Sequence, residues 1–176
     1  MRATGIVRRI DDLGRIVIPK EIRRNLKIKE GDALEIYTEN GGGIILMKYS
    51  PVGELSHYAE ELAQAIRFTL DKTTLICDRE KVVAASGSMR KMFEKQPISE
   101  ELLSAIENRT KRFEKAEDKK TAIISDGIAG NDVQIIVPII AEGQAIGAVI
   151  ILDEEAGEKE LAAAELAANV LAGQLT

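Results

Sequence analysis

Apolar and polar positions in the first part of the chain form short elements separated by turn signals. Segments 5–10 and 15–18 are rich in β-branched residues and flank the turn-forming residues 11–14, which predicts two strands joined by a turn. Pro19 suits the start of a helix, and apolar residues four positions apart follow it. We therefore expect a short helix over 20–26.

A second pair of strands completes this region. Segments 33–38 and 43–48 read as strands, and residues 39–42 between them (Glu-Asn-Gly-Gly) favour a hairpin turn. Fifty residues in β-β-α-β-β order bury little apolar surface, and a two-turn helix is not stable alone. The pattern therefore predicts a domain over 1–50 that folds as a homodimer.

The remaining chain has a different pattern. We expect a linker over 51–54 and then a domain over 55–176, which starts with an amphipathic helix over 55–70. The other predicted elements are strands 74–77 and 81–85, a helix capped by Ser99, an edge strand and loop within 111–120, strand 121–125, loop 126–132, strands 133–140 and 145–152, and helix 158–175. This order indicates an α+β domain whose largely antiparallel sheet is flanked by helices.

Composition narrows the class of protein. With 45% hydrophobic and 30% charged residues, the 176-residue chain is typical of folded domains. The apolar runs are too short to cross a bilayer and no leader opens the chain, so we expect no membrane partner and a cytoplasmic location. Cys77 and His57 are single residues of their kinds without catalytic or ligating partners. We expect no metal, no cofactor and no enzymatic activity.

Charge is distributed unevenly along the chain. The net charge is -5, yet residues 1–50 hold ten Lys/Arg against seven Asp/Glu, while residues 51–176 hold fourteen against twenty-two. Within residues 1–29 the count is nine basic against three acidic. A basic segment in an acidic protein indicates a polyanionic partner for that segment, although a solvated charged face is the alternative.

The basic residues of this segment are mostly arginine, which suits duplex DNA. Arg binds phosphates and reads base edges in the major groove. Arg23 and Arg24 lie off the Ile22/Leu26 stripe of the predicted helix, so they remain in solvent while the stripe is buried. Aromatic residues make up 3% of the chain, too few for a surface that stacks single-stranded bases. Double-stranded DNA is the expected partner.

A specific motif extends this interpretation. The run D-x-L-G-R-[IV]-V-I-P-x-E-[IL]-R-R, within residues 3–49, resembles the AbrB-type DNA-binding domain of bacterial transition-state regulators. The resemblance implies a swapped-hairpin β-barrel, an intertwined dimer in which the hairpins of two chains interleave, with Ile16, Val17, Ile18, Ile22 and Leu26 in its core. The family's DNA-contacting arginines match Arg8, Arg15, Arg23 and Arg24, and Arg9 occupies a neighbouring basic position. The family reads DNA shape more than a strict base code.

The second domain carries another resemblance. Its last hairpin, VPIIAEGQAIGAVIIL, followed by a helix resembles a GAF domain, and the whole arrangement is similar to sporulation-type regulators that activate or repress transcription. Small-ligand sensing is implied, but the cyclic-nucleotide motif of some GAF domains is missing, so the ligand is unknown. The helices 55–70 and 158–175 are expected to pair between chains into a homotetramer. Such a regulator is nucleoid-associated.

Two other function classes are kept as alternatives. Swapped-hairpin domains also occur in antitoxins, whose C-terminal part is an extended tail that binds a toxin; residues 54–176 are too apolar and too regular for such a tail. An enzyme or a pure small-molecule binder would use the GAF-like domain, but no nucleophile, base and acid set is found there. A DNA-binding transcription regulator remains the leading hypothesis.

Overall fold

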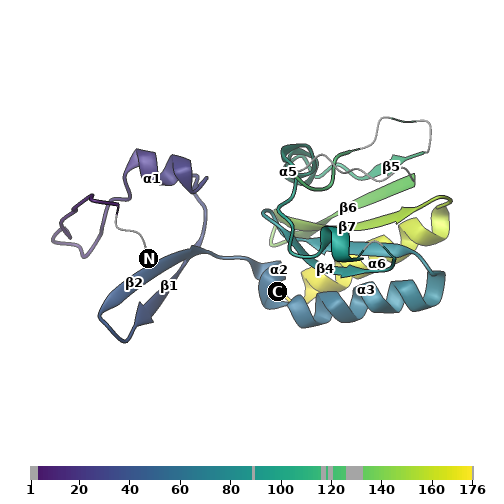
Figure 1. Cartoon of the computed structure of the whole chain (residues 1–176), viewed down its shortest axis with the longest axis horizontal. Coiled ribbons are helices and arrows are strands. Elements are labelled where there is room, and N and C mark those ends of the chain that lie inside the picture. Colours follow the sequence, from purple (N-terminus) through teal and green to yellow (C-terminus); the bar gives the residue numbers. More distant parts are fainter. Residues whose placement is uncertain (1–3, 89, 116–117, 119–120, 126–132, 176) are drawn as a thin grey trace. The chain divides into compact units, whose positions relative to one another are not determined.

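The chain divides into two compact units, Met1–Tyr49 and Ser50–Thr176. The structure, a computed structural model, describes residues 4–88, 90–115, 118, 121–125 and 133–175 (Figure 1). None of the helices within these residues has the length and apolar character needed to cross a bilayer.

The N-terminal unit contains one short helix and one hairpin. Helix α1 spans Lys20–Asn25, and strands β1 (Leu34–Glu39) and β2 (Gly43–Lys48) pair antiparallel from Leu34 opposite Lys48 to Glu39 opposite Gly43. Gly42 closes the turn with a φ of 80°, a conformation that favours glycine. The predicted helix and the second hairpin are confirmed.

The first predicted hairpin does not form strands. Segments 5–10 and 15–18 have no regular structure, although a tight turn joins them, with Asp11 N–H donating to the Arg15 carbonyl over 3.0 Å. The strand prediction for the isolated chain was therefore wrong. Extended segments become strands only when a neighbouring strand satisfies their backbone groups, and the single chain places none beside these two.

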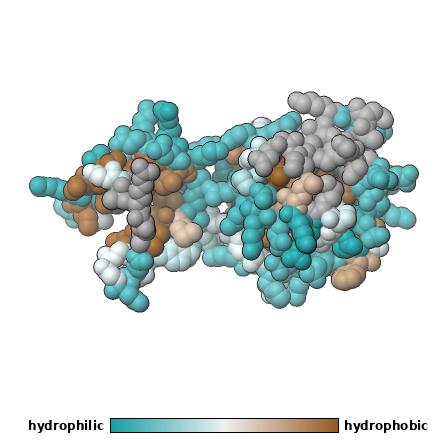
Figure 2. All heavy atoms as spheres, viewed as in Figure 1, coloured by the Kyte–Doolittle hydropathy of each residue, from teal (hydrophilic) through white to brown (hydrophobic). Residues whose placement is uncertain are grey.

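Apolar side chains of the N-terminal unit lie open to solvent. None of the described residues 4–49 is buried, and Figure 2 shows apolar surface over this unit. Ile16, Val17 and Leu26, which are predicted to belong to a core, are 54%, 69% and 58% exposed. The other exposed large apolar residues here are Val7, Ile10, Leu13, Ile36, Tyr37, Ile44, Leu46, Met47 and Tyr49. A single chain thus leaves this unit without a core.

The C-terminal unit is built on a five-stranded antiparallel sheet of order β4-β3-β7-β6-β5. Its strands are β3 (Thr73–Cys77), β4 (Val82–Ser86), β5 (Arg112–Glu114), β6 (Val133–Ala141) and β7 (Gln144–Asp153). The short β5 lies at an edge, as the sequence predicts for residues 111–120. Pro138 of β6 pairs with Ala148 of β7 but lies beyond the end of β5, so its missing N–H breaks no ladder on that side.

Helices cover both faces of this sheet (Figure 1). The helices are α2 (Pro51–Glu54), α3 (Ser56–Leu70), α4 (Arg90–Phe93), α5 (Glu100–Glu107) and α6 (Glu158–Gly173). One face packs against α3 and α6 through a cluster that includes Ile76, Ile135 and Leu171. The other packs against α4 and α5 through Phe93, Leu102 and Ile150. The predicted antiparallel sheet between helices is confirmed.

The expected linker is instead part of the C-terminal unit. Residues 51–54 form α2, and Val52 is fully buried in the α3–α6 core. Ser50 begins this helix, since its hydroxyl oxygen accepts from Gly53 N–H and the hydroxyl donates to Asp78, 2.7 Å away. The lack of a side chain at Gly147 leaves room, because a Cβ there would lie 3.2 Å from a Val52 methyl group and 2.1 Å from the Cys77 carbonyl oxygen. The linker prediction missed these contacts.

Segment 121–125 is not the strand that its sequence predicts. It forms one isolated bridge within the described residues, between Ile98 and Ile124, and the backbone N–H groups at its start bond to side chains. Thr121 N–H donates to Glu114, and Ala122 N–H donates to Glu101. These partners replace a strand ladder. The loop predicted over 126–132 lies outside the described residues.

Removing the Asp78 carboxylate should destabilise the C-terminal unit. It is 3% exposed and accepts from Ser50 Oγ and from the backbone N–H groups of Glu80 and Lys81, at 2.6–2.7 Å. We expect Asp78→Ala to lower the free energy of unfolding by about 3 kcal/mol, because buried donors lose their acceptor. Ser50→Ala should cost about 1 kcal/mol. Urea unfolding followed by far-UV circular dichroism would measure both free energies of unfolding. Equal decreases for the two variants would contradict the role of Asp78 as acceptor for three donors.

Candidate nucleic-acid interface

The five arginines predicted to contact DNA lie on two parts of the N-terminal unit. Arg8 and Arg9 precede the tight turn and Arg15 follows it directly, while Arg23 and Arg24 occupy the last turn of α1. All five are exposed. Within the described chain Arg8, Arg9, Arg23 and Arg24 form no ion pair, so their charges are available to a polyanion.

Helix α1 positions two of these side chains. Its amide ladder begins at the Pro19 carbonyl, which accepts from Arg23 N–H over 3.0 Å. Positive charge in the last turn is stabilised by the negative end of the helix dipole. Arg23 and Arg24 are exposed while Ile22 is half-buried, which agrees with the predicted separation of charge from the apolar stripe. Leu26, the other residue of that stripe, is not buried in the single chain.

The turn that carries Arg15 is organised by Asp11. Its Oδ1 accepts from the backbone N–H groups of Leu13 (3.0 Å) and Arg15 (2.8 Å), and its Oδ2 accepts from Arg15 Nε at 2.8 Å. The backbone N–H and then the guanidinium of Arg15 lower the pKa of Asp11 below its ordinary value. Gly14 completes the turn with a φ of 75°.

Sequence reasoning assigned Asp11 to the turn but missed its bond to the arginine. The four-residue spacing of an acid and a base could have indicated a pair, but that spacing is informative mainly on helices. Here a turn creates the contact. Of the five predicted arginines, Arg15 is thus the one whose side chain forms an ion pair within the described residues, and its partner is Asp11.

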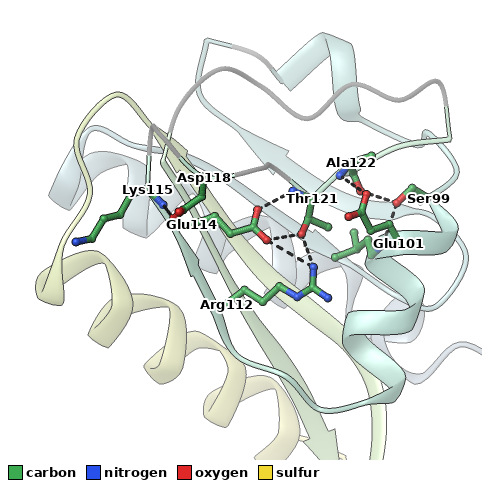
Figure 3. A network of polar contacts seen from close by, with 9 residues as sticks. Ser99, Glu101, Arg112, Glu114, Lys115, Asp118, Thr121 and Ala122 are labelled. Atoms are coloured by element: carbon green, nitrogen blue, oxygen red, sulfur yellow. Dashed lines mark hydrogen bonds and ion pairs between the residues drawn. The ribbon is translucent and has the colours of Figure 1, made fainter.

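The described part of the C-terminal unit contains a polar network around segment 121–125. Arg112 Nη1 donates to the hydroxyl of Thr121, which donates to Glu114 (Figure 3). The Ser99 hydroxyl donates to the Ala122 carbonyl and caps α5 by accepting from Leu102 N–H. This network anchors segment 121–125 between β5 and α5. Buried apolar side chains such as Leu102, Ile106 and Ile150 lie between the sheet and α5.

The candidate residues for catalysis or metal binding are not gathered into a reactive or metal-binding group within the described chain. No group of three potential metal ligands is present among the described residues. The His57 side chain is 80% exposed and lies 3.2 Å from Glu61. Cys77 is fully buried, and burial raises the pKa of its thiol to about 12. Neither residue has the environment of a reactive group.

A second surface of interest lies on α3 and α6. These helices pack side by side on one face of the sheet, and each leaves large apolar residues in solvent. On α3, Tyr58 and Phe68 are exposed; on α6, Leu166 and Val170 are exposed. Phe68 and Leu166 stand out at 86% and 66% exposure. We call these four residues the outer helix surface.

Two family models match the chain. Residues 54–176 match the model described as "Stage V sporulation protein T C-terminal, transcription factor". Residues 7–54 match the model described as "Antidote-toxin recognition MazE, bacterial antitoxin". Together the two matches cover the two units.

Individual relatives agree with this division. Stage V sporulation protein T of Bacillus subtilis (strain 168) is 47% identical over 178 residues, 99% of each chain. Transition state regulatory protein AbrB of the same organism is 61% identical over 51 residues, 29% of this chain and 52% of AbrB. The GAF domain structure of the nutrient sensor CodY from Clostridium difficile is 19% identical with a TM-score of 0.51, covering 66% of this chain and 83% of that one. The resemblances to AbrB and to the GAF fold are confirmed.

The Cys77 thiol should be unreactive in the native protein. At about pH 8 a thiol reagent modifies exposed cysteines, but the buried, neutral Cys77 should react only after unfolding in urea. Gln64→Cys, which places a second thiol on the exposed side of α3, is the matched control and should add one rapidly reacting group. Rapid modification of the wild-type protein would contradict the burial of Cys77.

Proposed function

Because the chain belongs to the stage V sporulation protein T family, a family of transcription factors, we propose that it is a homo-oligomeric regulator that binds double-stranded DNA through residues 1–50. The observation that carries this proposal is the set of five exposed arginines at Arg8, Arg9, Arg15, Arg23 and Arg24. They lie in the region that is 61% identical to AbrB, whose N-terminal region is called a DNA recognition domain. A regulator of this kind works at the nucleoid in the cytoplasm.

Dimer formation through residues 1–50 is part of the proposal. The exposed apolar side chains of the N-terminal unit and the two unformed strands point to a second chain as the missing partner. An intertwined swapped-hairpin dimer would supply backbone partners to segments 5–10 and 15–18. It would also double the arginine set, because each protomer contributes five.

The GAF-like unit is proposed to join two such dimers. The outer helix surface presents Tyr58, Phe68, Leu166 and Val170 to solvent, and helix pairing between chains would cover them. A tetramer holds two DNA-binding dimers together and binds with avidity.

The antitoxin alternative is less well supported. The match of residues 7–54 to an antitoxin model fits any swapped-hairpin domain. An antitoxin of that kind carries an extended tail, whereas residues 50–176 form a compact unit with two apolar clusters. The proposal of a regulator accounts for both units.

Removing one proposed phosphate contact should weaken DNA binding without disturbing the dimer. We expect Arg23→Ala to lower affinity for all duplex sequences and to reduce the slope of log affinity against log salt by about two per dimer, one per protomer. Electrophoretic mobility shifts at several salt concentrations would measure both. Lys91→Ala, an exposed charge on α4, is the control. Unchanged binding by Arg23→Ala and Arg15→Ala would contradict the proposed interface.

A charge on the outer helix surface should dissociate the tetramer into dimers. Leu166→Glu places a carboxylate at a 66% exposed position that helix pairing would bury, and burying an unpaired charge is unfavourable. Light scattering after size exclusion would show dimers with an unchanged circular dichroism spectrum. The control is Lys91→Glu, on the opposite side of the sheet. If Leu166→Glu remained a tetramer, assembly through this surface would be excluded.

A further inference from the structure

Arg15 differs from the other proposed DNA-contacting arginines in its environment. Its guanidinium is held by Asp11, with Nε 2.8 Å from Oδ2, whereas Arg8, Arg9, Arg23 and Arg24 form no ion pair within the described chain. The second oxygen of the same carboxylate is held by the backbone N–H groups of Leu13 and Arg15. Asp11 therefore cannot move without breaking the turn, and it fixes the guanidinium to the backbone.

This bond leaves one defined edge of Arg15 for a ligand. A guanidinium has five N–H donors, one on Nε and four on Nη1 and Nη2. With Nε occupied, the Nη1 and Nη2 end remains, and the structure gives it no partner within the described chain. The Arg15 side chain is 69% exposed, so this end is accessible. Such an end presents two parallel donors, the arrangement that a pair of adjacent acceptors requires.

The charge of Asp11 favours a base edge over a phosphate as that acceptor pair. Attraction to phosphate depends on net positive charge, and the adjacent carboxylate offsets the charge of Arg15 and repels phosphate oxygens. Hydrogen bonds to neutral base atoms depend on geometry, which the fixed guanidinium supplies. The O6 and N7 atoms of guanine in the major groove are the acceptor pair that arginine reads in this bidentate way.

We propose that Asp11 is a positioning residue that holds Arg15 for bidentate reading of guanine, while the unpaired arginines supply the sequence-independent attraction to phosphate. This inference rests on the proposed function, because it assumes that residues 1–50 bind duplex DNA. It assigns a specificity role to an acidic residue in an otherwise basic surface. It also separates the five arginines into one that discriminates sequences and four that set affinity.

The test compares Asp11→Asn with the neighbouring control Asp12→Asn in the full-length protein. The amide oxygen introduced by Asp11→Asn can still accept from the Leu13 and Arg15 backbone N–H groups, but its NH2 group cannot accept from Arg15 Nε. Asp12→Asn removes the same charge one residue away, and Asp12 forms no hydrogen bond with Arg15 in the described chain. The probes are a duplex that the wild-type protein enriches from a randomised pool and a scrambled duplex of the same composition.

We expect Asp11→Asn to lower the ratio of the two affinities about fivefold or more, the discrimination of one bidentate contact. Affinity for the scrambled duplex should stay equal or rise, and the salt slope should become steeper, because a freed Arg15 can then bind phosphate. Asp12→Asn should leave the ratio within about twofold of wild type. If both variants change the ratio equally, the effect is one of charge alone and the proposal is overturned.

A second comparison separates positioning from a general structural role. In the Arg15→Ala background, Asp11→Asn should have no further effect on the ratio, because Asp11 acts through Arg15. Should Asp11→Asn fail to form the dimer, Arg15→Lys replaces it: the charge and the turn remain, but the bidentate end is lost. We expect Arg15→Lys to lower the ratio to the same extent, and an unchanged ratio overturns the proposal.

The binding behaviour of the wild-type protein distinguishes a failure of this inference from a failure of the proposed function. If it binds duplexes but enriches none from the pool, base reading by Arg15 is overturned while the proposed function stands. If it binds no duplex at any salt concentration, the proposed function fails as well. Enrichment of guanine-containing sites that depends on both Asp11 and Arg15 supports the proposal.

Discussion

The constraint on which the rest of this protein depends is that residues 4–49 cannot bury their apolar side chains within one chain. Ile16, Val17 and Leu26 are each more than half exposed, and segments 5–10 and 15–18 have no strand partners. Large exposed apolar surface is unfavourable in water, and the proposed association of two chains would remove it. The same association would hold the arginines of two chains in fixed relative positions. Association of two chains would therefore serve both purposes: it would complete the fold of this unit and form the proposed DNA-binding surface.

The C-terminal unit meets the opposite condition, because a single chain buries two apolar clusters, one on either side of its sheet. Its boundary with the N-terminal unit is structurally defined: Val52 is buried in the core, and Ser50 bonds to Asp78. Residues from Ser50 onward therefore belong structurally to the C-terminal unit. The turn after β3 is thus bonded directly to the first residue of this unit, through Asp78 and Ser50.

Elements with strong local signals were predictable from sequence, and those that depend on remote partners were not. The hairpin at Glu39–Gly43 and the cap at Ser99 rest on local turn and capping chemistry, and helix α3 rests on its apolar periodicity. All three form as predicted. Segment 121–125 has a strand-like sequence, but its backbone bonds to Glu114 and Glu101, which no local pattern reveals. In the candidate site, the arginines were predictable from charge and motif. The Asp11–Arg15 bond was not, because it requires the turn that brings Asp11 back to Arg15.

The uneven charge of the chain follows its division into two units. Residues 51–176 hold fourteen Lys/Arg against twenty-two Asp/Glu, so the GAF-like unit repels a polyanion while the N-terminal unit attracts one. In the proposed assembly this difference would disfavour DNA at the outer helix surface, which is proposed to join the dimers. Asp11 is proposed to act in the same way on a single arginine. Its carboxylate disfavours a phosphate next to Arg15, whereas the guanidinium of Arg15 can still donate directional hydrogen bonds to a base. At both scales, negative charge would restrict where and how the proposed arginines contact DNA.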